Sequence, residues 1–257
     1  MSSPEKSQSI EPASLAMGIA VYIMWGFFPL YFHELSPAGS LEVIVHRALW
    51  GLISCIAVLL VARRWAKLRE LLRDREAVIR LGVAGILIVI NWTTYVFAVQ
   101  SGHTIDAALG YFINPLVTVA LARFVLKERL SRAQLIAIIL GIIAVVVLVV
   151  GLGRLPWVSL VLAFSFGLYS LVKKDVANRV PPLEGMIVET AAVTPFLLIY
   201  YVYLVATGAT SFHTIAADPS SGSADWLIHL ALLVGAGILT AIHCCFSRAQ
   251  PAACPWR

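Results

Sequence analysis

The sequence predicts an all-α integral membrane protein with about eight transmembrane helices. Sixty per cent of its residues are hydrophobic and 13% are charged, whereas soluble domains have about 45–50% and about 25%. The apolar residues also form runs of roughly 18–25 residues, which is long enough to cross a hydrocarbon core of about 30 Å. A soluble enzyme or a soluble nucleic-acid-binding domain is therefore excluded.

Each apolar run is predicted to form one membrane-spanning helix. The polar residues 1–13 precede the first run and lack the basic stretch and short apolar core of a cleavable signal peptide. We predict that they form a cytoplasmic tail. The predicted spans are 14–33, 40–62, 78–100, 107–126, 132–151, 156–172, 184–206 and 225–243.

Basic residues gather in alternate loops of this arrangement. Loop 63–75 carries six Lys or Arg residues, and loops 127–132 and 173–182 carry three each. The intervening loops have none, apart from Arg154. Because positive charge favours the cytoplasmic side, the N-terminus and, after eight spans, the C-terminus are predicted to lie inside. The net charge of +5 is thus an orientation signal rather than a nucleic-acid-binding patch.

An internal repeat relates the two parts of the chain. Three pairs of segments match in the same order: residues 25–30 with 166–171, Glu42 and Arg47 with Glu184 and Glu189, and 84–87 with 236–239, which both read AGIL. The repeat unit is about five spans, and an odd number of spans inverts the second copy, as in many secondary transporters. We expect residues 14–151 to form the first five-helix unit and residues 156–243 to form three helices of an incomplete second unit.

The last residues, 244–257, differ in character from the spans before them. They contain Cys244, Cys245 and Cys254, whose spacing does not match a zinc site. Two complete units would have ten spans, and this tail can be encoded so that a neighbouring reading frame continues a membrane span. We therefore expect a frameshift near Ile242 that removed two helices, which sequencing of the locus would test.

Polar side chains inside the predicted spans mark the candidate site. A charge in the bilayer costs about 2.5–3.5 kcal/mol on insertion scales, so such groups usually face a cavity. Asn91 and Tyr95 share one helix face, as do Tyr111 and Pro115 beyond the turn 101–106, because each pair is four residues apart. The predicted substrate contacts are His46, Arg47, Asn91, Tyr95, Tyr111 and Asn114.

Proton coupling and gating are assigned to a second set of residues. Glu189 lies about a third of the way into a span with no local partner in the sequence. We predict Glu189 or His46 as the proton-coupling group, because either side chain titrates when it is desolvated. Glu42, His103 and Asp106 lie near span ends, where we predict an outer gate or simply a turn.

Structural interpretations of the charged residues stay open at this point. Glu42 at the interface fits a solvated carboxylate. Arg47 fits a side chain that extends to the interface, or a structural partner of Glu42. His46 fits a neutral, hydrogen-bonded helix contact.

The polar residues around the turn 101–106 and several glycines have structural interpretations too. Asp106 fits the N-cap of the fourth span, and Asn114-Pro115 fits a helix kink. Small residues let transmembrane helices approach closely. The predicted close-packing points are Gly82, Gly85 and Gly141.

Motifs of ATP-driven, metal-dependent or hydrolytic chemistry are missing from the sequence. No Walker A pattern occurs, the six histidines are too scattered for a metal site, and no Ser/His/Asp or paired-carboxylate spacing is recognisable. We expect no enzymatic activity, no cofactor and no metal.

Five segments together resemble a known family. They are EVIVHRALW, NWTTYVFAVQSGHTIDAALGYFINPL, KERLS, FSFGLYSLVKK and GMIVETAAVTPFLLIYY. The chain is similar, from about Ser14 to Ile242, to the RarD (chloramphenicol-sensitive protein) branch of the EamA-type drug/metabolite transporter superfamily. The resemblance implies a ten-helix inner-membrane permease of two inverted five-helix repeats with a substrate cavity between them.

The sequence and the resemblance together predict a secondary transporter of small metabolites or drugs in the bacterial inner membrane. The alternatives are a non-functional truncated permease and, less in keeping with the motifs, an integral membrane enzyme that modifies lipids. The expected partners are an unidentified small-molecule substrate and the lipid bilayer, without nucleic acid, and a homodimer is one allowed assembly.

Overall fold

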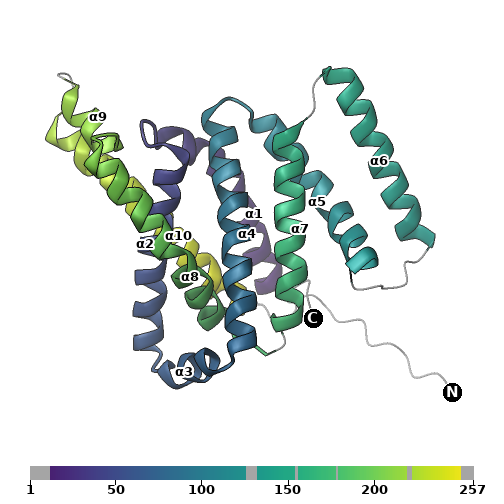
Figure 1. Cartoon of the computed structure of the whole chain (residues 1–257), viewed down its shortest axis with the longest axis horizontal. Coiled ribbons are helices and arrows are strands. Elements are labelled where there is room, and N and C mark those ends of the chain that lie inside the picture. Colours follow the sequence, from purple (N-terminus) through teal and green to yellow (C-terminus); the bar gives the residue numbers. More distant parts are fainter. Residues whose placement is uncertain (1–11, 126–131, 154–155, 178, 219–221, 250–257) are drawn as a thin grey trace.

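The computed structural model describes residues 12–125, 132–153, 156–177, 179–218 and 222–249, and these residues form helices joined by short turns (Figure 1). The described helices are α1 (Pro12–Glu34), α2 (Ser40–Val61), α3 (Trp65–Arg73), α4 (Arg75–Gln100), α5 (Thr104–Val125), α6 (Arg132–Leu152), α7 (Trp157–Ala177), α8 (Pro182–Ala206), α9 (Ser211–Ala217) and α10 (Ser223–Ala249).

The predicted all-α membrane class is confirmed. Within the described residues, seven stretches are long and apolar enough to cross a membrane. They lie in α2, α4, α5, α6, α7, α8 with α9, and α10. The remaining predicted span, 14–33, coincides with α1, a helix of 23 residues that is not one of these seven.

Two predicted loops contain helices, so the prediction was wrong there. The short helix α3 lies within loop 63–75, where Leu68 and Leu71 are buried while the charged residues face outward. Helix α9 lies within loop 207–224, and the Thr210 side chain caps it by accepting a hydrogen bond from the backbone N–H of His213. Helix α3 has mixed charge and α9 has only seven residues, so neither gives the signal of a span.

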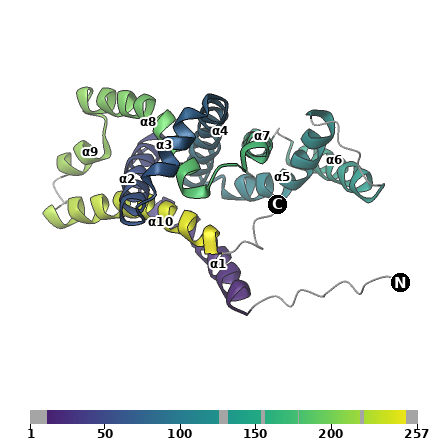
Figure 2. The same cartoon turned by 90° about the horizontal axis from the view of Figure 1, so that it is seen from below.

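Helices α2 and α4 form the centre of the molecule. Helix α2 packs against α8 and α10, and α4 packs against α7 and α8. Helix α5 lies between α7 and α6, so α6 stands at one end of the row and the α8–α9 pair at the other (Figure 2). Helices α3 and α9 lie at opposite ends of the bundle in Figure 1, and we name the two ends after them.

Two glycines bring the central helices into backbone contact. A Cβ atom built on Gly85 of α4 would lie 2.5 Å from the carbonyl oxygen of Glu189 in α8. A Cβ atom on Gly237 of α10 would lie 2.6 Å from the backbone nitrogen of Gly51 in α2. These are the glycines of the two AGIL segments, and side chains larger than hydrogen do not fit either contact.

The other two predicted packing glycines differ from each other. A Cβ atom on Gly141 of α6 would collide with the Leu116 side chain of α5. At Gly82 the corresponding atom would meet Ala192 at an ordinary 3.8 Å. Close packing at Gly85 and Gly141 is therefore confirmed, whereas Gly82 allows a methyl group.

Large apolar side chains face outward along α6, as a lipid environment requires. Val147 is 64% exposed and Val150 is 76% exposed. In water such a surface would be unfavourable, but in a bilayer it meets hydrocarbon chains.

The chain ends are described only in part. Helix α10 runs to Ala249 and so continues six residues beyond the predicted span end at 243. Residues 1–11, 126–131 and 250–257 lie outside the described residues, and with them most of the predicted cytoplasmic tail, most of the basic loop 127–132 and the end of the atypical tail.

Candidate functional site

Arg47 lies in an aromatic pocket inside the bundle. Its guanidinium carbon is 3.8 Å from the ring centre of Trp92 in α4, and about 6 Å from the rings of Phe28 and Phe32 in α1. Its Nε donates a 2.8 Å hydrogen bond to Thr240 of α10. Only 8% of the residue is exposed, so the alternative of a side chain extending to the interface is wrong.

The charge of Arg47 has no carboxylate partner among the described residues. Its former candidate partner, Glu42, is bonded elsewhere. Cation–π contacts stabilise a desolvated cation by about 2 kcal/mol or more, which offsets only part of the cost of removing a guanidinium from water. The site therefore holds a positive charge that no carboxylate of the described residues compensates.

Asn91 connects three helices. It is fully buried, and its side-chain amide donates 3.0 Å hydrogen bonds to the carbonyl oxygen of Leu162 and to the hydroxyl of Ser165, both in α7. The hydroxyl of Tyr111 in α5 donates to the Asn91 amide oxygen at 3.3 Å. The amide is thus already bonded within the protein, and Asn91 positions Tyr111.

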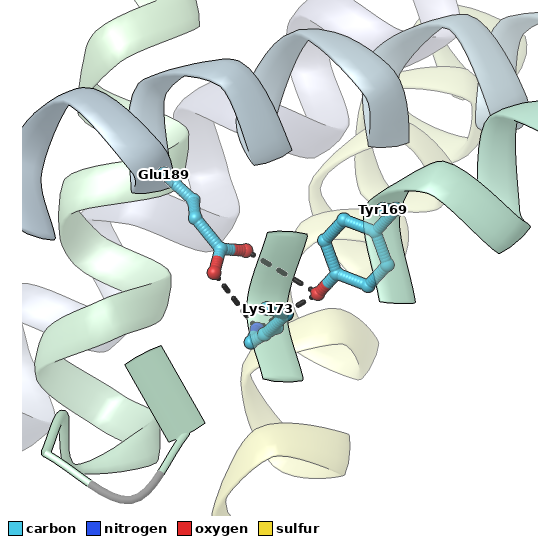
Figure 3. A network of polar contacts seen from close by, with 3 residues as sticks. All are labelled: Tyr169, Lys173 and Glu189. Carbon is cyan, nitrogen blue, oxygen red and sulfur yellow. Dashed lines mark hydrogen bonds and ion pairs between the residues drawn. The ribbon is translucent and has the colours of Figure 1, made fainter. Parts of the chain in front are cut away.

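Glu189 has a partner that the sequence did not reveal. Its Oε1 forms a 2.8 Å ion pair with Nζ of Lys173, and its Oε2 accepts a 3.4 Å hydrogen bond from the hydroxyl of Tyr169 (Figure 3). Lys173 also donates to that hydroxyl at 2.7 Å. The sequence indicated no local partner for Glu189, and its distant partner was not recognised because Lys173 was assigned to a loop, whereas α7 continues to Ala177 and includes it.

A row of aromatic rings links the two charged groups. Successive ring centres are 5.7–6.4 Å apart, within the range of favourable edge-to-face and tilted contacts. The row comprises Phe32, Tyr95, Tyr111, Phe166 and Tyr169. The row begins at Phe32, whose ring contacts Arg47. It ends at Tyr169, whose hydroxyl bonds Glu189 and Lys173.

The two ends of this row lie at similar depths from opposite ends of the bundle. Arg47 is seven residues from the start of α2 at Ser40, and Glu189 is seven residues from the start of α8 at Pro182. At 1.5 Å per residue this places each group about 10 Å from its helix end. The aromatic row therefore bridges the middle of the membrane-spanning region.

Glu42 holds the beginning of α9. Both carboxylate oxygens accept hydrogen bonds from the backbone N–H of Ser211, at 3.1 and 3.0 Å, and Oε1 also accepts from the Ser211 hydroxyl at 2.9 Å. Nε2 of His229 in α10 lies 2.9 Å from the same hydroxyl. With 2% exposure, Glu42 is not solvated at the interface, so that alternative is wrong.

Glu184 makes the corresponding contact at the α3 end. Its Oε1 lies 3.1 Å from Nε of Arg64, the residue that precedes α3, and its side chain is fully buried. We call the Glu42–Ser211 and Glu184–Arg64 contacts the two carboxylate clamps. In each clamp, the glutamate that opens a long helix binds the start of a short helix in the other half of the chain.

The remaining predicted residues lie nearer the ends or line the interior without strong partners. The ring of His46 packs edge-on against Tyr201 and Phe212, and neither ring nitrogen has a hydrogen-bond partner among the described residues. The hydrogen-bonded alternative for His46 is therefore wrong. Asn114 is half-buried and its amide oxygen accepts a 3.3 Å hydrogen bond from Thr118.

The turn before α5 differs from its prediction. Helix α5 begins at Thr104, so Asp106 is in its first turn and is not the N-cap. The backbone carbonyl of Asp106 accepts a 2.5 Å hydrogen bond from Ser159 of α7. Together with His103, whose backbone N–H donates to Ala98 at 2.7 Å, this region forms a packed turn.

The sequence alone does not reveal several important residues, because their partners lie far away in the chain. Lys173 and Arg64 were interpreted as orientation charges, and Trp92 and Ser211 gave no signal at all. The spacing of Lys173 four residues after Tyr169 was the one available clue, since residues four apart share a helix face.

Comparisons with known proteins identify the family of the chain. The model of the EamA-like transporter family matches residues 13–150. The chain is 40% identical to protein RarD of Streptomyces exfoliatus over 94% of its own length and 73% of that relative. It is 36% identical to protein RarD of Escherichia coli over 91% of its length and 75% of the relative.

A further relative carries only a general name. The chain is 39% identical to an uncharacterized transporter of Pseudomonas aeruginosa, over 91% of its length and 74% of the relative. No solved structure matches. On these similarities and on its bundle of apolar helices, the chain belongs to the EamA-like transporter family, in the RarD branch.

Proposed function

We propose that the protein is a secondary transporter that carries a small metabolite or drug across the bacterial inner membrane. The observation that supports this most is the membrane-buried aromatic row, which joins an uncompensated cation at one end to a paired carboxylate at the other. Its relatives favour a transporter over the lipid-modifying enzyme considered from the sequence.

The orientation follows from the basic residues. Helix α3 and its flanking turns carry six Lys or Arg residues between 63 and 75, whereas the α9 end carries almost none. Positive charge favours the cytoplasmic side. We therefore assign the α3 end and the N-terminus to the cytoplasm and the α9 end to the outside.

Three structural pairings support an inverted repeat in which residues 14–151 and 156–243 are related units. Gly85 of α4 packs on α8, and its match Gly237 of α10 packs on α2. The two carboxylate clamps have the same plan at opposite ends. The third pairing is that Arg47 and Glu189, which match in sequence, contact the matched residues Phe28 and Tyr169. The family model also matches one unit, residues 13–150.

In this proposal the substrate binds along the aromatic row, and the two units rock against each other to expose it to either side. Arg47, Tyr95 and Tyr111 contact the substrate, with Asn91 positioning Tyr111. His46 and Asn114 line its approach. The clamp at Glu42 belongs to the outer gate, next to His46.

Glu189 is the proposed proton-coupling group. Protonation would remove its charge and release Lys173 from the ion pair, which changes the contacts between α7 and α8. Replacement by Gln removes the titratable group while keeping its size. We expect Glu189→Gln to abolish the dependence of transport on a proton gradient, and unchanged pH-dependent uptake by this variant would refute the role.

Transport itself is tested without a known substrate. Purified protein is reconstituted into liposomes loaded with a bacterial metabolite extract, and the compounds that leave the vesicles are identified by mass spectrometry. We expect at least one compound to leave faster than from protein-free liposomes. Chloramphenicol is a rational addition to the extract, because a 26% identical relative is named chloramphenicol-sensitive protein RarD. Release identical to protein-free liposomes, from monodisperse protein, would overturn the proposal.

A further inference from the structure

The buried charge of Arg47 differs from the three buried glutamates described above. Glu184 is paired with Arg64, Glu189 with Lys173, and Glu42 accepts three hydrogen bonds at Ser211. The guanidinium of Arg47 contacts aromatic faces and donates one hydrogen bond to a hydroxyl. These three carboxylates are held by an ion pair or by several hydrogen bonds, whereas Arg47 has no carboxylate partner among the described residues.

An uncompensated guanidinium in a low-dielectric site has a strong preference for an anion. A buried charge is costly unless it is paired, and in membrane proteins such groups mark ligand pathways. Of the donors on Arg47, Nε is used by Thr240, and no described residue accepts a hydrogen bond from the two terminal amino groups. Those two groups form the planar fork that matches the two oxygens of a carboxylate or phosphate.

The surroundings of the fork also indicate what the rest of the ligand is like. Trp92 stacks on the guanidinium, and Phe32 leads from it into the row of rings at Tyr95 and Tyr111. Aromatic faces bind flat apolar groups well. The hydroxyls of Tyr95 and Tyr111 are the polar groups that this part of the row offers, and that of Tyr111 also bonds Asn91.

On the basis of the proposed transport function, we propose that the substrate is an organic oxyanion with a flat, apolar body. Its oxyanion pairs with the terminal amino groups of Arg47, and its body lies against Tyr95 and Tyr111. The anion supplies the countercharge that the protein lacks. Lys173, the cation beside the matching residue Glu189 in the other unit, is already paired with that carboxylate and does not compete for the substrate.

The test uses the full chain and the metabolite extract described above. For the wild-type protein, the released compounds are sorted by their charge at neutral pH. We expect oxyanions with aromatic or planar groups to dominate. We expect Arg47→Gln to lower their release at least tenfold and Arg47→Lys to lower it less, because Lys keeps the charge but loses the fork.

Arg80→Gln is the matched control. Arg80 is another arginine of a membrane-spanning helix, but it is paired with Glu76 at 2.7 Å and partly exposed, so its loss should leave release unchanged. Treating the extract with a phosphatase before loading separates the two sources of an oxyanion. Compounds whose release survives this treatment are carboxylates, and compounds whose release is lost are phosphate esters.

The outcomes separate this inference from the transport function. Release of mainly neutral or cationic compounds would overturn the oxyanion while the transporter stands, and so would undiminished release of anions by Arg47→Gln. Release of nothing would remove the transport function and the inference with it. If Arg47→Gln does not fold, the charge of the compounds released by the wild-type protein decides the question alone.

Discussion

Arg47 and Glu189 occupy matching positions in the two proposed units, yet they are compensated in opposite ways. Each lies five residues after the clamp glutamate of its helix. Each also contacts an aromatic residue of the preceding long helix in its unit: Arg47 contacts Phe28 of α1, and Glu189 contacts Tyr169 of α7. One helical turn after Phe28 comes Phe32, whose ring packs against Arg47. One turn after Tyr169 comes Lys173, which forms an ion pair with Glu189. The lysine therefore neutralises Glu189, whereas the phenylalanine leaves Arg47 charged.

The comparison separates stability from function. A charge paired within the protein contributes to stability, because removing either partner exposes the other to a low-dielectric environment. A charge without a partner contributes little to stability, and we propose that Arg47 is retained to bind a ligand. Four predictions test this difference, from the largest expected effect to the smallest.

Removal of the Glu189 carboxylate should give the largest loss of stability. We expect Glu189→Ala to destabilise the protein by about 2–3 kcal/mol, less than a fully buried pair because the Lys173 side chain is 35% exposed. Thermal unfolding in detergent should shift down by about 4–10 °C. By contrast, Arg47→Met should change stability by less than about 1 kcal/mol, because no buried carboxylate is left behind.

The double variant Glu189→Ala with Lys173→Met provides the control. It removes both charges, so it should recover much of the stability lost in the single variant, and the difference measures the pair itself. A double variant as unstable as Glu189→Ala would show that the pair is not the cause. An Arg47→Met variant as unstable as Glu189→Ala would remove the distinction between the two sites.

The glycine contacts test whether the two units really match. We expect Gly85→Ala and Gly237→Ala to lower stability by similar amounts, about 1–2 kcal/mol each, since the new methyl groups meet backbone atoms at 2.5 and 2.6 Å. Gly82→Ala is the control, with an ordinary 3.8 Å contact, and should be neutral or stabilising. Unfolding midpoints that differ widely between the first two variants would argue against equivalent positions.

The carboxylate clamp at Glu42 should have a smaller and more local effect. Glu42→Gln keeps one acceptor for Ser211 but loses the charge, at a cost of about 1 kcal/mol. Hydrogen exchange measured by mass spectrometry should therefore speed up in α9 while exchange in α4 stays the same. Equal acceleration in both helices would mean that the change loosens the whole bundle.

Tyr111→Phe should have the smallest effect on stability, about 0.5 kcal/mol, because its hydrogen bond to Asn91 is long at 3.3 Å. If Tyr111 contacts the substrate, the Tyr111→Phe variant should transport it several-fold more slowly than this loss of stability explains. Comparison with Thr118→Val, which removes a similarly long bond to Asn114, controls for the loss of a hydroxyl group. Equal transport by both variants would exclude Tyr111 from the site.

Apolar runs of span length and paired glycines are properties of short stretches of sequence, and these were predicted well. Gly85 and Gly141 do sit at close contacts, and α2, α4 and α8 lie within a few residues of their predicted spans. The elements that were missed depend on other information. Helix α9 is too short to have a periodic pattern, and it is held by Glu42, which lies 169 residues earlier in the chain.

The interior of the site was the least predictable part. The sequence identified Arg47, Asn91 and Glu189 as polar groups in apolar spans, but a side chain's partner depends on which helices become neighbours. Asn91 lies 71 residues before Leu162 and bonds it across two helices, and no spacing rule covers such a distance. Glu189 was assigned no partner because Lys173 was counted among the loop charges.

The two carboxylate clamps have a consequence for how the protein is made. Glu42 and Arg64 belong to the first half of the chain, but their partners Ser211 and Glu184 are synthesised only with the second half. Until then neither clamp is closed, and the first half lacks the contacts that the second half supplies to Glu42 and Arg64. Fragments split between α6 and α7 should therefore accumulate only when they are expressed together, and the finished protein should become resistant to proteolysis in a single late step.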